Sequence, residues 1–68
     1  MAVQITLNGK NEQIEEGTTV AEVLKTKNVR PEIVAVEING EIIDRDEYET
    51  MQLRRGDEMD YLHYMAGG

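Results

Sequence analysis

Residues 34–43 read VAVEINGEII and carry a clear strand-turn-strand pattern. Val34, Val36 and Ile38 alternate with other residues, which is the period of a strand with one buried face. Asn39-Gly40 then supplies two residues that tolerate positive φ, and the last three residues can return as a short antiparallel strand. The stretch therefore predicts the central hairpin of a sheet.

The sequence on either side of this hairpin completes an α+β pattern. Upstream, Thr19 and Glu22 fit a capping box that starts a helix of nine or ten residues, and Asn28 can end it in the left-handed conformation. The expected strands cover residues 3–7, 11–15, 33–38, 41–43 and 58–65, whereas residues 44–53 predict irregular chain with a short helical turn near Tyr48. We therefore predict one mixed sheet crossed by one helix, with residues 1–65 as a single domain.

Apolar residues at strand and helix spacing predict the core of this domain. They are Val3, Ile5, Val20, Leu24, Val36, Ile38, Leu53, Met59 and Tyr61. In the last strand, Met59 and Tyr61 alternate with Leu62 and Tyr64, so only one of these two pairs can be buried. We assign the first pair to the core and expect the second pair to be exposed.

Composition excludes several classes of function. The 68 residues carry a net charge of −7, which opposes binding to nucleic acid or to an anionic membrane and suits a basic partner protein. Acidic side chains also keep a small domain in solution without any partner. No run of 18 apolar residues occurs, so no membrane span is expected. With no Cys and no Ser, and His63 as the one histidine, neither a Ser-His-Asp or Cys-His nucleophile arrangement nor a thiolate metal site can be assembled. We expect a cytoplasmic protein that holds no metal and is not an enzyme.

The end of the chain is its least ordinary feature. After the alternating pattern stops at Met65, only Ala66, Gly67 and Gly68 remain. Two glycines at the carboxyl end predict a flexible tail over residues 66–68, because glycine has the greatest backbone freedom.

The whole chain resembles the ubiquitin-like β-grasp sulfur carriers, and most closely the thiamine-biosynthesis (ThiS) type. The resemblance spans residues 3–68 and rests on four segments in the expected order and spacing: GTTVAEVL at 17–24, VAVEINGEII at 34–43, RGDEM at 55–59 and MAGG at 65–68. Asp44, Tyr48 and Asp60 depart from the residues that are frequent in the family at these positions. The resemblance implies a ubiquitin-like β-grasp fold.

The resemblance also implies a function. A ThiF-like adenylyltransferase would use MgATP to convert the Gly68 carboxylate into an acyl adenylate, and a sulfur donor such as a cysteine desulfurase would supply the sulfur of a thiocarboxylate. A ThiG-like thiazole synthase would then receive that sulfur, and the chain itself would bind no cofactor. Ala66 and Gly67 would thread the tail into a narrow channel, because they place almost no side chain near the reacting carbonyl.

Two alternatives stay open at this point. The same fold and tail would serve a ubiquitin-like protein modifier, or a sulfur carrier for molybdopterin, cysteine or homocysteine. We predict partner docking at Asp60, Leu62, Tyr64 and Met65, since apolar groups beside a functional tail suggest a contact surface, although scattered apolar residues also occur on ordinary surfaces. His63 has no companion at metal-ligand spacing, and we expect it to be solvated or structural.

Overall fold

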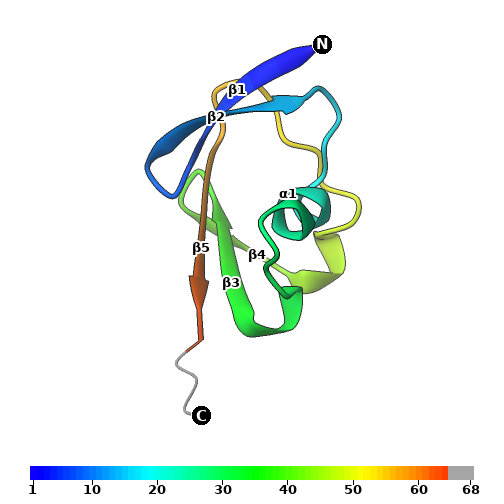
Figure 1. Cartoon of the computed structure of the whole chain (residues 1–68). Helices are drawn as coiled ribbons and strands as arrows, with labels where there is room; N and C mark the ends of the chain where they lie inside the picture. Colours follow the sequence, from blue (N-terminus) through cyan, green and yellow to red (C-terminus); the bar gives the residue numbers. More distant parts are fainter. Residues whose placement is uncertain (65–68) are drawn as a thin grey trace.

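The computed structural model describes residues 1–64, which form a five-stranded sheet with one α-helix against one face (Figure 1). The strands are β1 (Ala2–Leu7), β2 (Lys10–Glu15), β3 (Val34–Ile38), β4 (Glu41–Ile43) and β5 (Glu58–His63). The helix α1 spans Val20–Thr26, and two short 3-10 helices, η1 (Pro31–Ile33) and η2 (Arg45–Glu47), lie in the connections. The predicted arrangement of one mixed sheet and one helix is confirmed.

The last strand of the chain lies in the middle of the sheet. The strand order is β2-β1-β5-β3-β4, in which β5 runs parallel to β1 and antiparallel to β3. The two outer pairs, β1 with β2 and β3 with β4, are antiparallel hairpins. The chain therefore leaves the sheet from a strand that has neighbours on both sides at its start.

Both predicted Asn-Gly hairpin turns are confirmed. Asn8 and Gly9 have φ angles of 50° and 84°, and Asn39 and Gly40 have φ angles of 54° and 87°. Two successive positive φ angles match the right-handed twist of the flanking strands, which is why asparagine and glycine are favoured here. The Asn39 side chain also accepts a hydrogen bond of 2.9 Å from the backbone N–H of Glu58, so this turn holds the start of β5.

The helix begins at the predicted capping box. Thr19 Oγ1 accepts the backbone N–H of Glu22 at 3.2 Å, and Glu22 Oε1 accepts the backbone N–H of Thr19 at 2.9 Å. The helix has seven residues instead of the predicted nine or ten, because its last turn tightens. There the Asn28 N–H reaches back only three residues, to the Lys25 carbonyl at 3.0 Å, and Asn28 takes the predicted left-handed conformation, with φ at 60°.

Seven of the nine predicted core residues are buried between α1 and the sheet, and the other two, Val3 and Tyr61, are only partly buried. Val3 was wrongly assigned to the core: it lies near the start of β1, before the residues of β1 that pair with β5, and does not belong to the main cluster. Tyr61 does pack against that cluster. The core also contains four buried residues outside the predicted list of nine: Leu7, Val23, Val34 and Tyr48.

Two strand boundaries also differ from the predicted ones. Ile33 was expected to begin the central strand, but it belongs to η1 and is exposed, because Pro31 starts a 3-10 turn there. The last strand was expected to reach Met65, but β5 ends at His63. Among residues 1–64, no helix is long and apolar enough to cross a membrane.

Candidate docking surface

The predicted tail residues Ala66, Gly67 and Gly68 lie outside the described residues, and so does the predicted docking residue Met65. The structure does show how the chain approaches them. β5 ends at His63, and the backbone N–H of Tyr64 still donates to the Ile33 carbonyl at 2.8 Å. The segment before the tail is therefore held to the rest of the domain up to Tyr64.

The face of β5 that points away from the helix carries two of the predicted docking residues. Met59 is fully buried beneath α1, whereas Leu62 is 71% exposed and Asp60 is exposed as well. Side chains alternate along a strand, so Asp60 and Leu62 lie on the uncovered face of the sheet. The predicted assignment of Met59 to the core and Leu62 to the surface is confirmed.

Neighbouring strands extend this surface. Ala35 of β3 pairs with Leu62, and Glu37 of β3 pairs with Asp60 on one side and with Ile42 of β4 on the other. Ile42 is 75% exposed. We call the set Ala35, Glu37, Ile42, Asp60 and Leu62 the outer-face patch. Its two large hydrophobic members, Ile42 and Leu62, are exposed enough to be desolvated by a partner.

Sequence patterns did not single out Ala35, Glu37 or Ile42 as surface partners of β5. A signal for Ile42 was nevertheless present. Ile42 and Ile43 are consecutive apolar residues in a short strand, and successive side chains point to opposite faces. Since Ile43 packs against the core, Ile42 must lie on the uncovered face. Ala35 and Glu37 could not be identified in this way, because the sequence alone does not show the register between β3 and β5.

The outer-face patch carries unbalanced negative charge. Glu37 and Asp60 lie directly opposite each other, and like charges at such positions destabilise a sheet. Within residues 1–64 the ion pairs lie elsewhere, joining the Met1 amino group to Glu15 and Lys27 to Glu12. A basic group from a partner would relieve the repulsion between the two carboxylates. This patch therefore fits an apolar surface that carries a cation.

The third described docking residue, Tyr64, lies just beyond the end of β5 and is 59% exposed. Its phenol is close enough to that of Tyr48 to help raise the pKa of Tyr48, after the larger effect of burial. A hydrogen bond with the Val36 backbone acts in the opposite direction. Tyr64 is exposed, as predicted.

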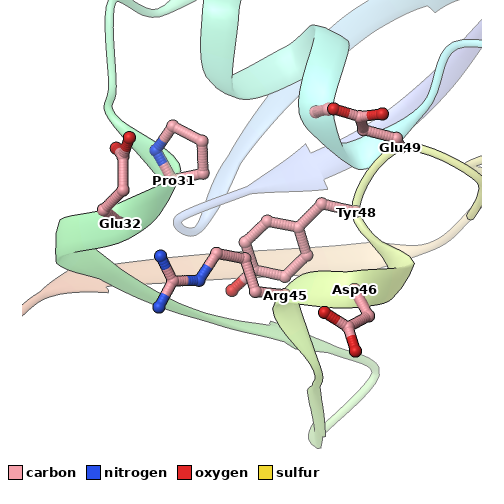
Figure 2. Close-up of a pocket in the computed structure, with 7 residues that line it drawn as sticks. Pro31, Glu32, Arg45, Asp46, Tyr48 and Glu49 are labelled. Atoms are coloured by element: carbon pink, nitrogen blue, oxygen red, sulfur yellow. The ribbon is translucent and has the colours of Figure 1, made fainter.

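A hollow around Tyr48 lies between η1 and η2, apart from the outer-face patch (Figure 2). Figure 2 shows Arg45 extending from η2 toward Pro31 and Glu32 of η1, with the Tyr48 ring beneath. The Tyr48 side chain is buried and forms part of the core, and this burial raises the pKa of its hydroxyl. Among residues 1–64, no group of three potential ligands could hold a metal ion.

Comparisons with known proteins agree with this architecture. The model of the ThiS family matches residues 2–68. The sulfur carrier protein ThiS of Bacillus subtilis is 33% identical over 63 residues, which cover 91% of this chain and 96% of that protein. A thiazole synthase of Magnetococcus marinus is 35% identical over 66 residues, covering 97% of this chain, but the chain spans only 20% of that larger protein.

Solved structures give the same result for the fold. The crystal structure of the thiamine biosynthesis protein ThiS from Geobacter metallireducens superposes with a TM-score of 0.84 at 33% identity, covering 97% of this chain and all of that one. A solution structure of a thiamine biosynthesis protein from the same organism gives a TM-score of 0.77, with coverage of 97% and 88%. The ubiquitin-like β-grasp fold is thereby confirmed, and the chain belongs to the ThiS family, the sulfur carriers of thiamine biosynthesis.

Proposed function

We propose that the chain carries sulfur as a thiocarboxylate on Gly68 and delivers it to thiazole formation. The observation that carries the proposal is the extent of the family match, which runs through residue 68 and so includes both glycines of the tail. A carrier of this kind is a co-substrate and performs no catalysis of its own.

The proposed loading reaction has three steps. The Gly68 carboxylate attacks the α-phosphate of MgATP on an adenylyltransferase, which forms an acyl adenylate and releases pyrophosphate. A persulfide sulfur from a donor such as a cysteine desulfurase attacks the acyl carbon, and AMP leaves. A thiol then reduces the resulting acyl disulfide and frees the thiocarboxylate. All three steps belong to the cytosol, where MgATP is supplied.

The residues of the tail suit the first step. A carboxylate is a weak nucleophile, so the partner must hold it in line with a phosphate and exclude water. Gly67 and Gly68 have no Cβ, and Ala66 has only a methyl group, so an extended backbone with these residues fits a narrow channel. Larger side chains at these positions would require a wider channel in the partner, and a wider channel would admit water.

The outer-face patch and Tyr64 supply the proposed docking contacts. Leu62 and Ile42 offer apolar area, and Glu37 with Asp60 offers charge for a basic partner. Docking next to the strand that leads into the tail would fix the direction of tail entry and spare part of the ordering entropy. The adenylyltransferase and the thiazole synthase would use this surface in turn.

The proposed acceptor is a thiazole synthase. The match to the Magnetococcus marinus thiazole synthase supports this choice, because a segment similar to nearly the whole of this chain is part of that protein. A carrier and its acceptor that are joined in one polypeptide have a high effective concentration for each other.

The test is a loading reaction with purified components. The chain, the adenylyltransferase of the same organism, MgATP and a persulfide donor should yield a product in which sulfur replaces one terminal oxygen, as measured by intact mass. Deleting Gly68, or extending the chain beyond it, should abolish the product without changing the circular dichroism spectrum. A covalent conjugate to partner lysines, with no sulfur-containing product, would instead identify a protein modifier.

A further inference from the structure

The second half of β5 has a strand beside it on only one side among the described residues. β1 pairs with β5 only at Thr6 with Glu58 and at Leu7 with Met59. β3, in contrast, pairs with β5 as far as Val34 with His63. Figure 1 shows β5 continuing past the end of the β1–β2 hairpin toward the carboxyl end. This leaves a notch in the sheet where β1 stops.

Hydrogen bonds show which backbone groups point into this notch. The Asn8 N–H donates to the Met59 carbonyl at 2.9 Å, and the Tyr61 N–H donates to Asn8 Oδ1 at 2.9 Å. On the opposite side, the Tyr64 N–H donates to the Ile33 carbonyl of the segment before β3. Because backbone groups alternate in direction along a strand, the Tyr61 carbonyl and both backbone groups of His63 face the notch.

We call these three groups, the Tyr61 carbonyl with the N–H and carbonyl of His63, the β5 edge. Proteins usually protect such an edge with proline, lysine, a bulge or a covering segment. Residues 60–64 read DYLHY and contain neither proline nor lysine, and within residues 1–64 no strand pairs with this side of β5 beyond Met59. His63 is exposed. The edge is therefore accessible to a strand from another chain.

A hollow in the uncovered face lies beside the β5 edge. Its lining residues are Asn8, Ala35, Glu37, Asp60, Tyr61 and Leu62. Two of them, Glu37 and Asp60, are the opposed carboxylates of the outer-face patch, and Leu62 is its most exposed member in β5. A strand added at the edge would point alternate side chains toward this hollow.

We propose that an extended segment of the adenylyltransferase pairs with the β5 edge as an additional strand and places a lysine or arginine side chain against Glu37 and Asp60. This inference rests on the proposed function, and it specifies how the partner holds the chain. Strand addition supplies affinity through backbone hydrogen bonds and selectivity through the side-chain sites. Because the edge leads directly toward the tail, the same contact would aim the tail at the partner's reaction centre.

Charge argues against a second copy of this chain as the occupant. Each copy carries a net charge of −7, and two copies paired through β5 would bring two sets of Glu37 and Asp60 near each other. Like charges across an interface oppose association, whereas a basic segment would be attracted. A chain that is monomeric alone and bound by the adenylyltransferase is the expected behaviour.

The test compares His63→Pro with His63→Ala. Proline removes the His63 N–H and blocks the edge, but it spares the ladder to β3, which does not use that N–H. Alanine removes the imidazole, including its edge-on contact with Tyr61, and keeps the N–H. By calorimetry with the adenylyltransferase, the proline variant should bind about tenfold more weakly, as expected for one or two lost hydrogen bonds, while the alanine variant should stay within about twofold.

Amide hydrogen exchange tests the same point in the unchanged chain, and so does not depend on whether the proline variant folds. The His63 amide should exchange faster than the Tyr64 amide in the isolated chain and become protected when the adenylyltransferase is bound. Equal binding by the two variants, an unprotected His63 amide in the complex, or a dimer of the isolated chain would each overturn the inference.

The loading reaction separates this inference from the proposed function. If the unchanged chain gains sulfur while the His63 amide stays unprotected in the complex, the carrier function stands and the strand pairing is wrong. If the unchanged chain neither binds the adenylyltransferase nor gains sulfur, the proposed function fails and the inference fails with it.

Discussion

The same substitution at two leucines should separate stability from docking. Leu24 is fully buried and Leu62 is 71% exposed. Leu24→Ala should lower the free energy of unfolding by about 2 to 5 kcal/mol, because it removes buried methyl groups and leaves a cavity. A domain of this length has only about 3 to 10 kcal/mol in total. With an unfolding entropy of about 0.14 kcal/mol per degree for 68 residues, a loss of about 3 kcal/mol lowers Tm by about 20 °C.

Leu62→Ala should weaken partner binding and leave stability almost unchanged. Its free energy of unfolding should change by no more than about 0.5 kcal/mol, since the side chain is already in water. Its binding to the adenylyltransferase should weaken by about 1 to 3 kcal/mol, since a partner would desolvate the side chain fully. Urea unfolding and thermal circular dichroism measure the first quantity, and surface kinetics below the Tm of the Leu24 variant measure the second. If Leu62→Ala destabilises the fold more than Leu24→Ala, the assignment of the two faces is wrong, and if it binds like the parent, Leu62 is not a docking residue.

Three further outcomes are expected. Thr19→Ala should lower the free energy of unfolding in urea by about 0.5 to 2 kcal/mol, because it breaks the capping box, whereas Thr26→Ala at the exposed end of the helix should have a smaller effect. Burial raises the pKa of Tyr48 above its ordinary value of 10.0, so the folded chain holds this proton more tightly than the unfolded chain. The resulting contribution to stability is complete below pH 10 and is lost as pH rises through the folded pKa, and Tyr48→Phe should reduce that loss in urea titrations at alkaline pH. Raising salt should slow association with a basic adenylyltransferase much more than it speeds dissociation, because the net charge of −7 acts mainly on encounter, and a salt-independent association rate would contradict this.

Features that depend on neighbouring residues were predictable from the sequence. The Asn-Gly turns at 8–9 and 39–40 and the capping box at Thr19 each use side chains within a few residues of the backbone groups that they serve. Their geometry follows from local φ preferences and short hydrogen bonds, so distant contacts change them little. Strand alternation similarly identified the buried face of β5, because one apolar face must be covered in a single small sheet.

Features set by the register between distant strands were not predictable. Tyr48 follows a run of polar residues with no apolar periodicity, yet the tertiary fold buries it near the Val36 backbone of β3. Glu37 meets Asp60 only because β3 and β5 pair antiparallel with one particular register. The notch beside β5 likewise depends on where β1 stops relative to β5, which no residue in either strand determines alone. Ala35 and Glu37 of the candidate docking surface therefore required the structure.

The position of β5 explains how one small domain can both hold its tail and present it. At Glu58 and Met59 the strand pairs on both sides, with β1 and β3, and Met59 is fully buried. From Tyr61 onward, the β1 side within residues 1–64 offers only the Asn8 side chain, whereas β3 and the segment before it stay hydrogen-bonded to β5 up to Tyr64. The strand is therefore hydrogen-bonded on two sides at its start and mainly on one side near the tail. A partner that pairs with the β5 edge would supply the strand pairing that β5 lacks on its β1 side. It would then need to order few further residues to reach Gly68.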